Sequence, residues 1–363
     1  MKLHKIGFLL NLVLFLVHGG VSAQANIRKL NEQAQRLAEA YLKDENIAGM
    51  SISISWSDSI IFSKGFGFSN IESQILVQPS RTRFRIASIT KTLTAATVAR
   101  LSELQQIDFR KSVGHYLDSL PKKQYDFSVA EVGGHVAGLK RVPSAEKYTC
   151  DNQYGRKDFY RVYASDNLLF PPSTQFSYSN YGYKLLGLVV EKVTGVSIAE
   201  NHKKYIIDVI GLKNTVPEDK AKDGMTAKFY VKNKGELVPA PCLDCTFKYA
   251  QGCYLSTSED LVILGNAYLH PNRILQKETL VEILKPRKLV NGQSTNYGFG
   301  FGVSKDFYGN LCYGHTGGYE GSSSSLLVYP GSKLVIAILI NGDVKDINAL
   351  ATKISNNYIS RLK

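Results

Sequence analysis

Apolar residues near the start of the chain recur at two different periods, which predict a helix followed by a hairpin. Over residues 27–43 they recur at roughly the helical period of 3.6 residues. Further along, they alternate with serines, at Met50, Ile52, Ile54 and Trp56. This alternation predicts a half-buried strand, then a Ser-Asp-Ser turn at 57–59 and a returning strand.

The middle of the chain favours helices. Residues 88–105 predict an amphipathic helix with one apolar side, formed by Leu93, Ala96, Leu101 and Leu104. A second helix is predicted at 181–193, after the break at Pro171 and Pro172. A third is predicted at 259–269, where Ser256 or Ser258 would cap the first turn.

The C-terminal part returns to strand patterns. Residues 296–306, 310–318 and 323–342 predict an antiparallel meander with turns at 308–310 and 330–332. A last helix is predicted at about 346–361. Because each strand must bury one face, strands from the two ends of the chain must pair with one another.

These elements predict an α+β fold. One antiparallel β-sheet, flanked by the N- and C-terminal helices, would come from about 26–82 and 290–363. A mostly helical subdomain, about 83–289, would be inserted into it. No clear linker separates the two parts, so a single domain over 26–363 is expected.

Residues 1–23 predict a secretory signal peptide. Lys2 and Lys5 precede an apolar run over 6–17, and small residues follow. The run is too short for a comfortable membrane span. Cleavage would follow Ala23 or Ala25, and an uncleaved N-terminal anchor is the alternative. The expected location is secreted or periplasmic.

The net charge of the chain limits the kinds of molecule that it is expected to bind. The 363 residues include 44 Lys and Arg against 31 Asp and Glu, a formal net charge of +13. The basic residues are scattered and no nucleic-acid module is found, so no nucleic-acid partner is expected. The positive field would favour association with anionic cell-envelope polymers. The charge and the 21 tyrosines also leave an envelope adhesion protein as an interpretation.

Five cysteines leave at least one thiol unpaired: Cys150, Cys242, Cys245, Cys253 and Cys312. A local disulfide, typical of an oxidising compartment, is one interpretation. Free thiols are a second. A metal knuckle is a third interpretation. A zinc site requires a fourth ligand, however, and none is obvious in the sequence, so no metal is assigned. The sequence does not fix the pairing.

The first candidate for chemistry is Ser88 with Lys91. Ser-x-x-Lys occurs four times, but only this copy opens a long helix with an apolar face. The i,i+3 spacing puts the lysine beside the serine. A desolvated lysine can accept the serine proton, and helix N–H groups favour an oxyanion. The alternative is that Ser88 is only an N-cap and Lys91 a solvated helix residue.

Two further motifs follow. Tyr178 and Asn180 precede a predicted helix; a phenol near a cation can act as a base, and the amide can donate to a substrate carbonyl. The alternative is a buried packing tyrosine, and a rival Tyr-x-Asn lies in the predicted turn at 308–310.

The other motif is a glycine-containing segment on a predicted inner strand, made of His315, Thr316, Gly317 and Gly318. Glycines there leave room for a ligand to approach the strand closely. Its alternative is a glycine-rich bulge.

The three motifs occur in an order that resembles the serine β-lactamase and DD-peptidase (penicillin-binding) superfamily. The likeness is to its class C-like branch, and closest to the serine β-lactamase-like hydrolases. It spans about residue 30 to the C-terminus, in segments that include "FRIASITKTLTA", "FSYSNYGYKLLGLVVEKVTG" and "GHTGGYEG". The resemblance implies that Ser88 is acylated and that Lys91 and Tyr178 share its proton. It implies substrate binding by a second group: Asn180, His315, Thr316, Gly317 and Gly318.

Two departures from the family pattern matter. His315 stands where β-lactamases have lysine, and a histidine is mostly neutral at pH 7. "HVAGL" replaces the family's His-Thr-Ser-Gly-Leu, and we interpret its His135 as structural. The insert that follows is rich in aromatic residues, which would form a rim to the cleft or pack among themselves: Tyr148, Tyr154, Phe159, Tyr160 and Tyr163.

The sequence thus predicts a secreted serine hydrolase that works through an acyl-enzyme on peptides, esters or amides. β-Lactam hydrolysis would be slow. No metal or organic cofactor is implied, and the partner is a small-molecule or peptide substrate. The alternative from another class is a non-catalytic penicillin-binding sensor or a polymerising scaffold. The natural substrate and the oligomeric state are not fixed by the sequence.

Overall fold

A seven-stranded antiparallel sheet organises the molecule. The computed structural model describes residues 4–142, 150 and 154–362. The strand order is β3-β2-β1-β12-β11-β10-β9. The first three strands are β1 (Gly49–Trp56), β2 (Ser59–Asn70) and β3 (Ile75–Leu76). The other four are β9 (Gly302–Lys305), β10 (Leu311–Tyr319), β11 (Ser322–Tyr329) and β12 (Leu334–Ile340).

The two ends of the chain meet in the middle of this sheet. β1 pairs with β12 in a register that sets Met50 opposite Ile340 and Ile54 opposite Ile336. The predicted pairing of strands from both ends, and with it the α+β fold, is confirmed.

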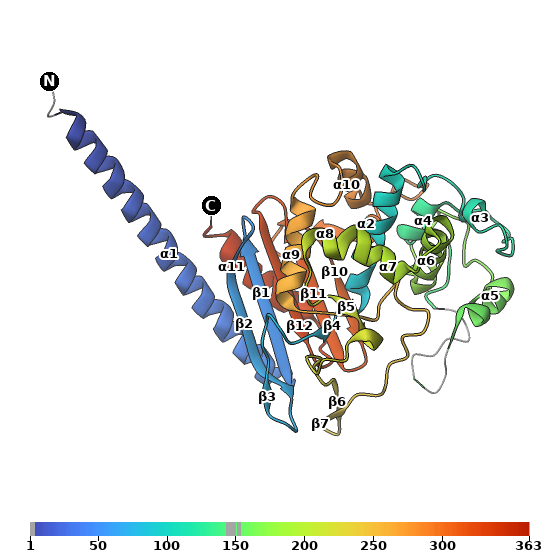
Figure 1. Cartoon of the computed structure of the whole chain (residues 1–363), viewed down its shortest axis with the longest axis horizontal. Coiled ribbons are helices and arrows are strands. Elements are labelled where there is room, and N and C mark those ends of the chain that lie inside the picture. Colours follow the sequence, from blue (N-terminus) through green and yellow to red (C-terminus); the bar gives the residue numbers. More distant parts are fainter. Residues whose placement is uncertain (1–3, 143–149, 151–153, 363) are drawn as a thin grey trace.

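Helices cover both faces of the sheet. On one face lie α1 (His4–Asp44) and α11 (Ile347–Ile359), packed over a core of Ile, Leu and Tyr side chains. On the other lies α9 (Ser258–Leu269), which contacts β1, β11 and β12. Figure 1 shows the N-terminal half of α1 reaching well away from the sheet. None of the helices described by the structure is both long and apolar enough to cross a membrane.

The serines of β1 are buried, which the alternating pattern did not predict. Ser51, Ser53 and Ser55 have no exposed surface, because α9 covers their face of the sheet. The Ser51 and Ser53 hydroxyls each lie 2.7 Å from Ser258 Oγ. The expected half-buried strand is therefore buried on both faces. Its polar side is satisfied by hydroxyl pairs rather than by water.

The inserted part is built around α2 (Thr90–Glu103), which the short 3₁₀ turn η1 (Ala87–Ile89) precedes. It was expected to be amphipathic, but its threonines are buried as well, because helices surround it. The helices of this part are α3 (Val113–Tyr116), α4 (Val129–Gly133), α5 (Arg156–Ser165), α6 (Asn180–Thr194), α7 (Ile198–His202), the π-turn η2 (Lys203–Ile207), α8 (Asp208–Ile210), η3 (Glu218–Lys220) and α10 (Lys277–Leu284).

Two small sheets complete this part. The first joins β4 (Phe84–Arg85), β8 (Tyr254–Ser256) and β5 (Val216–Pro217). The second is the hairpin of β6 (Tyr230–Asn233) and β7 (Glu236–Pro239). β4 leads directly into η1, so the first small sheet sets where α2 begins.

Two local predictions need correction. The strand expected at 296–306 is strand only over β9, because Phe299 and Phe301 turn inward and are fully buried in the helical core. The cap of α9 is Thr257, whose hydroxyl accepts the Asp260 N–H, rather than Ser256 or Ser258.

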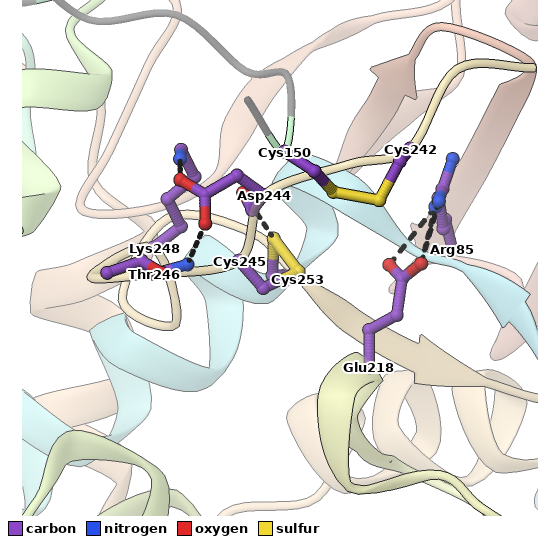
Figure 2. The surroundings of a disulfide bond; sticks show 9 residues. All are labelled: Arg85, Cys150, Glu218, Cys242, Asp244, Cys245, Thr246, Lys248 and Cys253. Carbon is purple, nitrogen blue, oxygen red and sulfur yellow. Dashed lines mark hydrogen bonds and ion pairs between the residues drawn. A yellow bond between two sulfur atoms is a disulfide. The ribbon is translucent and has the colours of Figure 1, made fainter. Parts of the chain in front are cut away.

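Four of the cysteines form two disulfides, Cys150–Cys242 and Cys245–Cys253, each with Cα atoms 5.6 Å apart. Figure 2 shows both bonds: Cys245–Cys253 lies within the segment that connects β7 to β8, and Cys150–Cys242 ties that segment to the chain between α4 and α5. Cys312 is a buried free thiol. Among the described residues, no cluster of acidic, His and Cys side chains is arranged to hold a metal ion. Because Cys242, Cys245 and Cys253 are all joined in disulfides, the metal-knuckle interpretation is wrong.

The segment that carries Cys242, Cys245 and Cys253 contains a buried ion pair. The Lys248 ammonium lies 2.6 Å from the Asp244 carboxylate, and the Thr246 N–H donates to the same carboxylate (Figure 2). Cys253 has a φ of +58°, a left-handed conformation that favours glycine. Its bond to Cys245 holds the chain in this conformation just before β8.

Gly317 marks the place where the sheet contacts the start of α2. A Cβ atom there would lie 2.3 Å from the Ile86 carbonyl oxygen and 2.4 Å from Ser324 Oγ. We predict that Gly317→Ala lowers the free energy of unfolding by about 1–3 kcal/mol, because the added methyl group would push β10 away from the backbone of Ile86. Urea denaturation would measure the loss.

Gly331→Ala is the matched control for this prediction. Gly331 is exposed, and nothing lies within 4 Å of the Cβ position. Equal stabilities of the two variants would contradict the close packing of β10 against η1.

Candidate active site

Ser88 lies at the point where β4, η1 and α2 join. The Ile86 N–H donates to the Tyr254 carbonyl at 3.0 Å, and Ser324 Oγ donates to the Ile86 carbonyl at 2.9 Å. Ala87 is thereby held at a φ of +44°, which L-residues rarely adopt. Neither η1 nor α2 is capped by a side chain, so the interpretation of Ser88 as an N-cap is wrong.

Lys91 is fully buried beside Ser88. Its Nζ lies 3.0 Å from Ser88 Oγ, 2.8 Å from Asn180 Oδ1 and 3.1 Å from the Gln251 carbonyl oxygen. All three acceptors are neutral oxygens. Burial, and secondarily the charge of Arg141, hold the pKa of Lys91 well below its ordinary range. The interpretation of Lys91 as a solvated helix residue is therefore wrong, and its amine is suited to accept a proton.

The Gln251 carbonyl is held in place by a buried network around His202. Thr94 Oγ1 donates to the Ala250 carbonyl at 2.7 Å and therefore accepts from His202 Nε2, 3.0 Å away. His202 Nδ1 then accepts from the Tyr254 hydroxyl at 3.1 Å. This network joins α2, α7 and β8, and it fixes the backbone next to the third acceptor of Lys91.

Tyr178 faces Lys91 from just before α6. Lys91 Nζ lies 5.0 Å from the centroid of the Tyr178 ring, which is only partly buried. Asn180, the first residue of α6, is fixed by its N–H bond to the Arg141 carbonyl at 2.8 Å. The rival tyrosine, Tyr308, lies in the turn between β9 and β10, where its N–H donates to an aspartate side chain.

The strand motif lies on β10. β9 pairs with β10 only as far as Gly314, so within the described residues the outer edge of β10 from His315 onward is open to a ligand. Thr316 is exposed there, and Gly317 packs against Ile86 and Ala87, next to Ser88. Gly318 follows directly. An extended chain could therefore lie along this edge within reach of Ser88.

His315 is neutral in this arrangement. Its Nδ1 contacts the Thr316 carbonyl oxygen, which can only accept, so Nδ1 carries the proton. Nε2 then accepts from the Tyr297 hydroxyl at 2.9 Å, and the Tyr178 hydroxyl is 3.5 Å away. Burial, followed by the charge of Lys91, lowers the pKa of His315 to about 3. The strand therefore carries no positive charge at neutral pH.

His135 supports the phenols from behind. Its ring centroid lies 4.4 Å from that of Tyr178 and 4.6 Å from that of Tyr297. Its Nδ1 accepts the Ser179 N–H at 3.0 Å, so Nε2 bears hydrogen and faces no hydrogen-bond acceptor among the described residues. The sequence-based interpretation of His135 as structural agrees with this position.

A cavity of about 500 Å³ opens beside these groups. Its lining includes Tyr178, Tyr297, His315 and Thr316, together with Asn348 and Thr352 of α11, but neither Ser88 nor Lys91. The aromatic insert does not form a rim in the described residues. Phe159 is fully buried and packs against Tyr181, with ring centroids 4.9 Å apart. Tyr148 lies outside the described residues.

Sequence reasoning missed three residues of the site. Tyr297 lies in a segment expected to be a strand, and its aromatic and glycine-rich pattern, "NYGFGFG", was the available signal. Gln251 contributes only a backbone carbonyl, which leaves no mark on side-chain patterns. Arg141 is an ordinary loop arginine in sequence, yet its Cζ lies 5.6 Å from the centroid of the Tyr178 ring.

Comparison with known proteins shows the family to which the chain belongs. A family model described as Beta-lactamase matches residues 34–355. The chain therefore belongs to the beta-lactamase family of serine hydrolases. It is similar to the mitochondrial serine beta-lactamase-like protein LACTB of Homo sapiens, with 26% identity over 425 residues that cover 87% of this chain and 78% of that protein.

Solved structures share the fold. An octameric penicillin-binding protein homologue from Pyrococcus abyssi matches with a TM-score of 0.78 at 25% identity, covering 91% of this chain and 76% of that one. The D-amino acid amidase from Ochrobactrum anthropi matches with a TM-score of 0.77 at 19% identity, covering 92% of this chain and all of that one.

The buried histidines predict how stability depends on pH. Burial lowers the pKa of His202 and of His315 to about 3, and that of His135 well below its ordinary range. In the unfolded chain each would titrate near 6.5. Below that pH the unfolded state binds protons that the folded state does not, so the free energy of unfolding falls as the pH falls, by about 1.4 kcal/mol per pH unit for each histidine.

His202→Gln isolates one of these contributions. The variant is less stable than the wild type at pH 8, because the network around residue 202 is broken. Between pH 5.5 and pH 4, the difference in unfolding free energy between the wild type and the variant should shrink by about 1.4 kcal/mol for each unit that the pH falls. Urea denaturation across that range measures it, and a constant gap would show that His202 titrates normally in the folded state.

Proposed function

We propose that the protein is a secreted hydrolase that forms an acyl-enzyme on Ser88. The observation that carries the proposal is the buried Lys91 amine, 3.0 Å from Ser88 Oγ, whose hydrogen-bond partners in the described chain are all neutral oxygens. A lysine in this state can take the proton of the attacking hydroxyl at neutral pH. In this proposal residues 26–363 are one hydrolase domain.

The proposal also assigns a role to each remaining residue of the site. Ser88 Oγ attacks the substrate carbonyl and passes its proton to Lys91. The N–H groups of Ser88 and Gly318 stabilise the oxyanion. Tyr178 gives its phenol proton to the leaving group and takes the proton held by Lys91 in its place, while Asn180 orients both Lys91 and the substrate. Thr316 and Gly317 hold the substrate along the open edge of β10. Lys91 and Tyr178 then activate water, which releases the acyl group.

The expected substrates are small peptides, amides or esters. Similarity to a D-amino acid amidase and to a penicillin-binding protein homologue supports this range. A neutral His315 gives a penicillin carboxylate no cation on the strand, so we expect slow β-lactam hydrolysis. The alternative, a penicillin-binding sensor or scaffold, would be acylated without turnover.

Replacing the nucleophile tests the proposal. Ser88→Ala should lower turnover of a p-nitrophenyl ester by about a thousandfold or more, because no hydroxyl remains to be acylated. Intact-mass analysis should show an acyl adduct in the wild type and none in the variant. Ser119→Ala is the matched control, since it belongs to an exposed Ser-x-x-Lys copy.

Two outcomes would count against the hydrolase. Full activity of Ser88→Ala would refute the mechanism. A single stoichiometric burst in the wild type, with a stable adduct and no further turnover, would favour the binding protein instead.

Export from the cytoplasm is part of the proposal. Its support is the pattern of Lys2, Lys5 and the apolar run at 6–17, together with two disulfides, which persist in oxidising compartments. We predict that the exported chain begins at Gln24 or Asn26. N-terminal sequencing of protein from the periplasm or medium would show it, and an intact Met1 in the exported protein would indicate an uncleaved anchor.

A further inference from the structure

The third acceptor of Lys91 lies in a loop that a disulfide closes. The Gln251 carbonyl oxygen is 3.1 Å from Lys91 Nζ, and Gln251 lies between the two cysteines of the Cys245–Cys253 bond. The Gln251 N–H donates to the Lys248 carbonyl at 3.1 Å, so residues 248–251 form a tight turn inside the loop. The disulfide therefore spans the segment that supplies one of the three oxygens around the buried amine.

This loop has two unfavourable features. Cys253 has a φ of +58°, in the left-handed region that is costly for a residue with a Cβ atom. The Gln251 side chain is only 1% exposed, and neither polar atom of its amide has a hydrogen-bond partner among the described residues. A buried amide without a partner is unfavourable, because it has given up its bonds to water. Both costs would be relieved if the loop opened, so an additional constraint must hold it closed.

The hydrogen bonds on either side of Gln251 do not supply that constraint. Before it, a hydroxyl of α2 donates to the Ala250 carbonyl at 2.7 Å, and after the turn the Cys253 carbonyl accepts a backbone N–H at 3.0 Å. Between these fixed points lies Gly252, and glycine is the residue whose backbone rotates most freely. The direction of the Gln251 carbonyl thus depends on the conformation of Cys253, which the covalent bond fixes.

We propose that the Cys245–Cys253 disulfide is a positioning element of the active site. It holds the Gln251 carbonyl against Lys91 Nζ, and without it the acylation of the nucleophile is slow. The inference rests on the proposed function, in which Lys91 accepts the Ser88 proton. An open loop would withdraw one acceptor from the amine, which would then no longer be fixed beside Ser88 Oγ. Small displacements of a reacting group slow a reaction strongly.

Removal of the bond tests the inference. In Cys245→Ala/Cys253→Ala, the maximal rate of acylation by a p-nitrophenyl ester, measured before the steady state, should fall about tenfold to a hundredfold. The ester concentration that gives half of this rate should stay within about threefold of the wild type, because the proposal gives the loop no contact with the substrate. A variant that acylates at the wild-type rate would overturn the inference.

The other disulfide provides the matched control. Cys150 and Cys242 are both exposed and lie outside the loop at 245–253. Cys150→Ala/Cys242→Ala therefore also removes one disulfide, but it should keep the maximal acylation rate within about threefold of the wild type. Equal slowing of acylation in the two double variants would show a general loss of rigidity and would also overturn the inference.

A glycine variant tests the physical cause. Glycine adopts a φ of +58° without steric cost, so Cys245→Ala/Cys253→Gly should acylate at least about threefold faster than Cys245→Ala/Cys253→Ala. Equal rates in these two variants would contradict the role assigned to the backbone of Cys253. Far-UV circular dichroism at the assay temperature shows which variants are folded, and the glycine variant supplies the test against the wild type if the alanine variant is not.

Trypsin reports on the loop independently of catalysis. Lys248 has no exposed surface and pairs with Asp244 at 2.6 Å (Figure 2), so the folded wild type should resist cleavage after Lys248. Fragment masses should show this cleavage about tenfold faster in Cys245→Ala/Cys253→Ala than in the control variant. That result would support the constraint on the loop even if the wild type hydrolysed no ester, whereas equal resistance would overturn it.

Discussion

The site depends on one buried amine. Lys91 lies in the interior, and no carboxylate among the described residues neutralises it, so burial would be costly if its amine were charged. The fold meets this constraint by supplying three neutral oxygens from three separate segments: the turn before α2, the start of α6 and the disulfide-closed loop. Much of the inserted part can be understood as what holds these three oxygens around one nitrogen.

Electrostatics around this amine set the character of the cleft. His315, on the strand, is kept neutral by its own carbonyl contact and by the Tyr297 hydroxyl. The exposed positive charge lies instead on the loop before α6, at Arg141.

The sequence predicted the features that depend on neighbouring residues and missed those that depend on contacts between segments far apart in the chain. The spacing of Ser88 and Lys91, and the position of Tyr178 before a helix, follow from local periodicity, and the structure brings these side chains together. The burial of Ser51 and Ser53 under α9 depends on a segment some 200 residues away. The cysteine pairing and the Gln251 carbonyl are likewise consequences of tertiary contacts, which single-sequence patterns do not encode.

The register between β1 and β12 has a consequence for biosynthesis. Met50 finds its partner, Ile340, only when nearly the whole polypeptide has left the ribosome. Until then β1 has no β12 to pair with in the middle of the sheet. The loop between these two strands is long, so it closes slowly. The nascent chain thus stays without its finished core throughout translation, the condition in which a polypeptide can still be threaded through a narrow translocation pore.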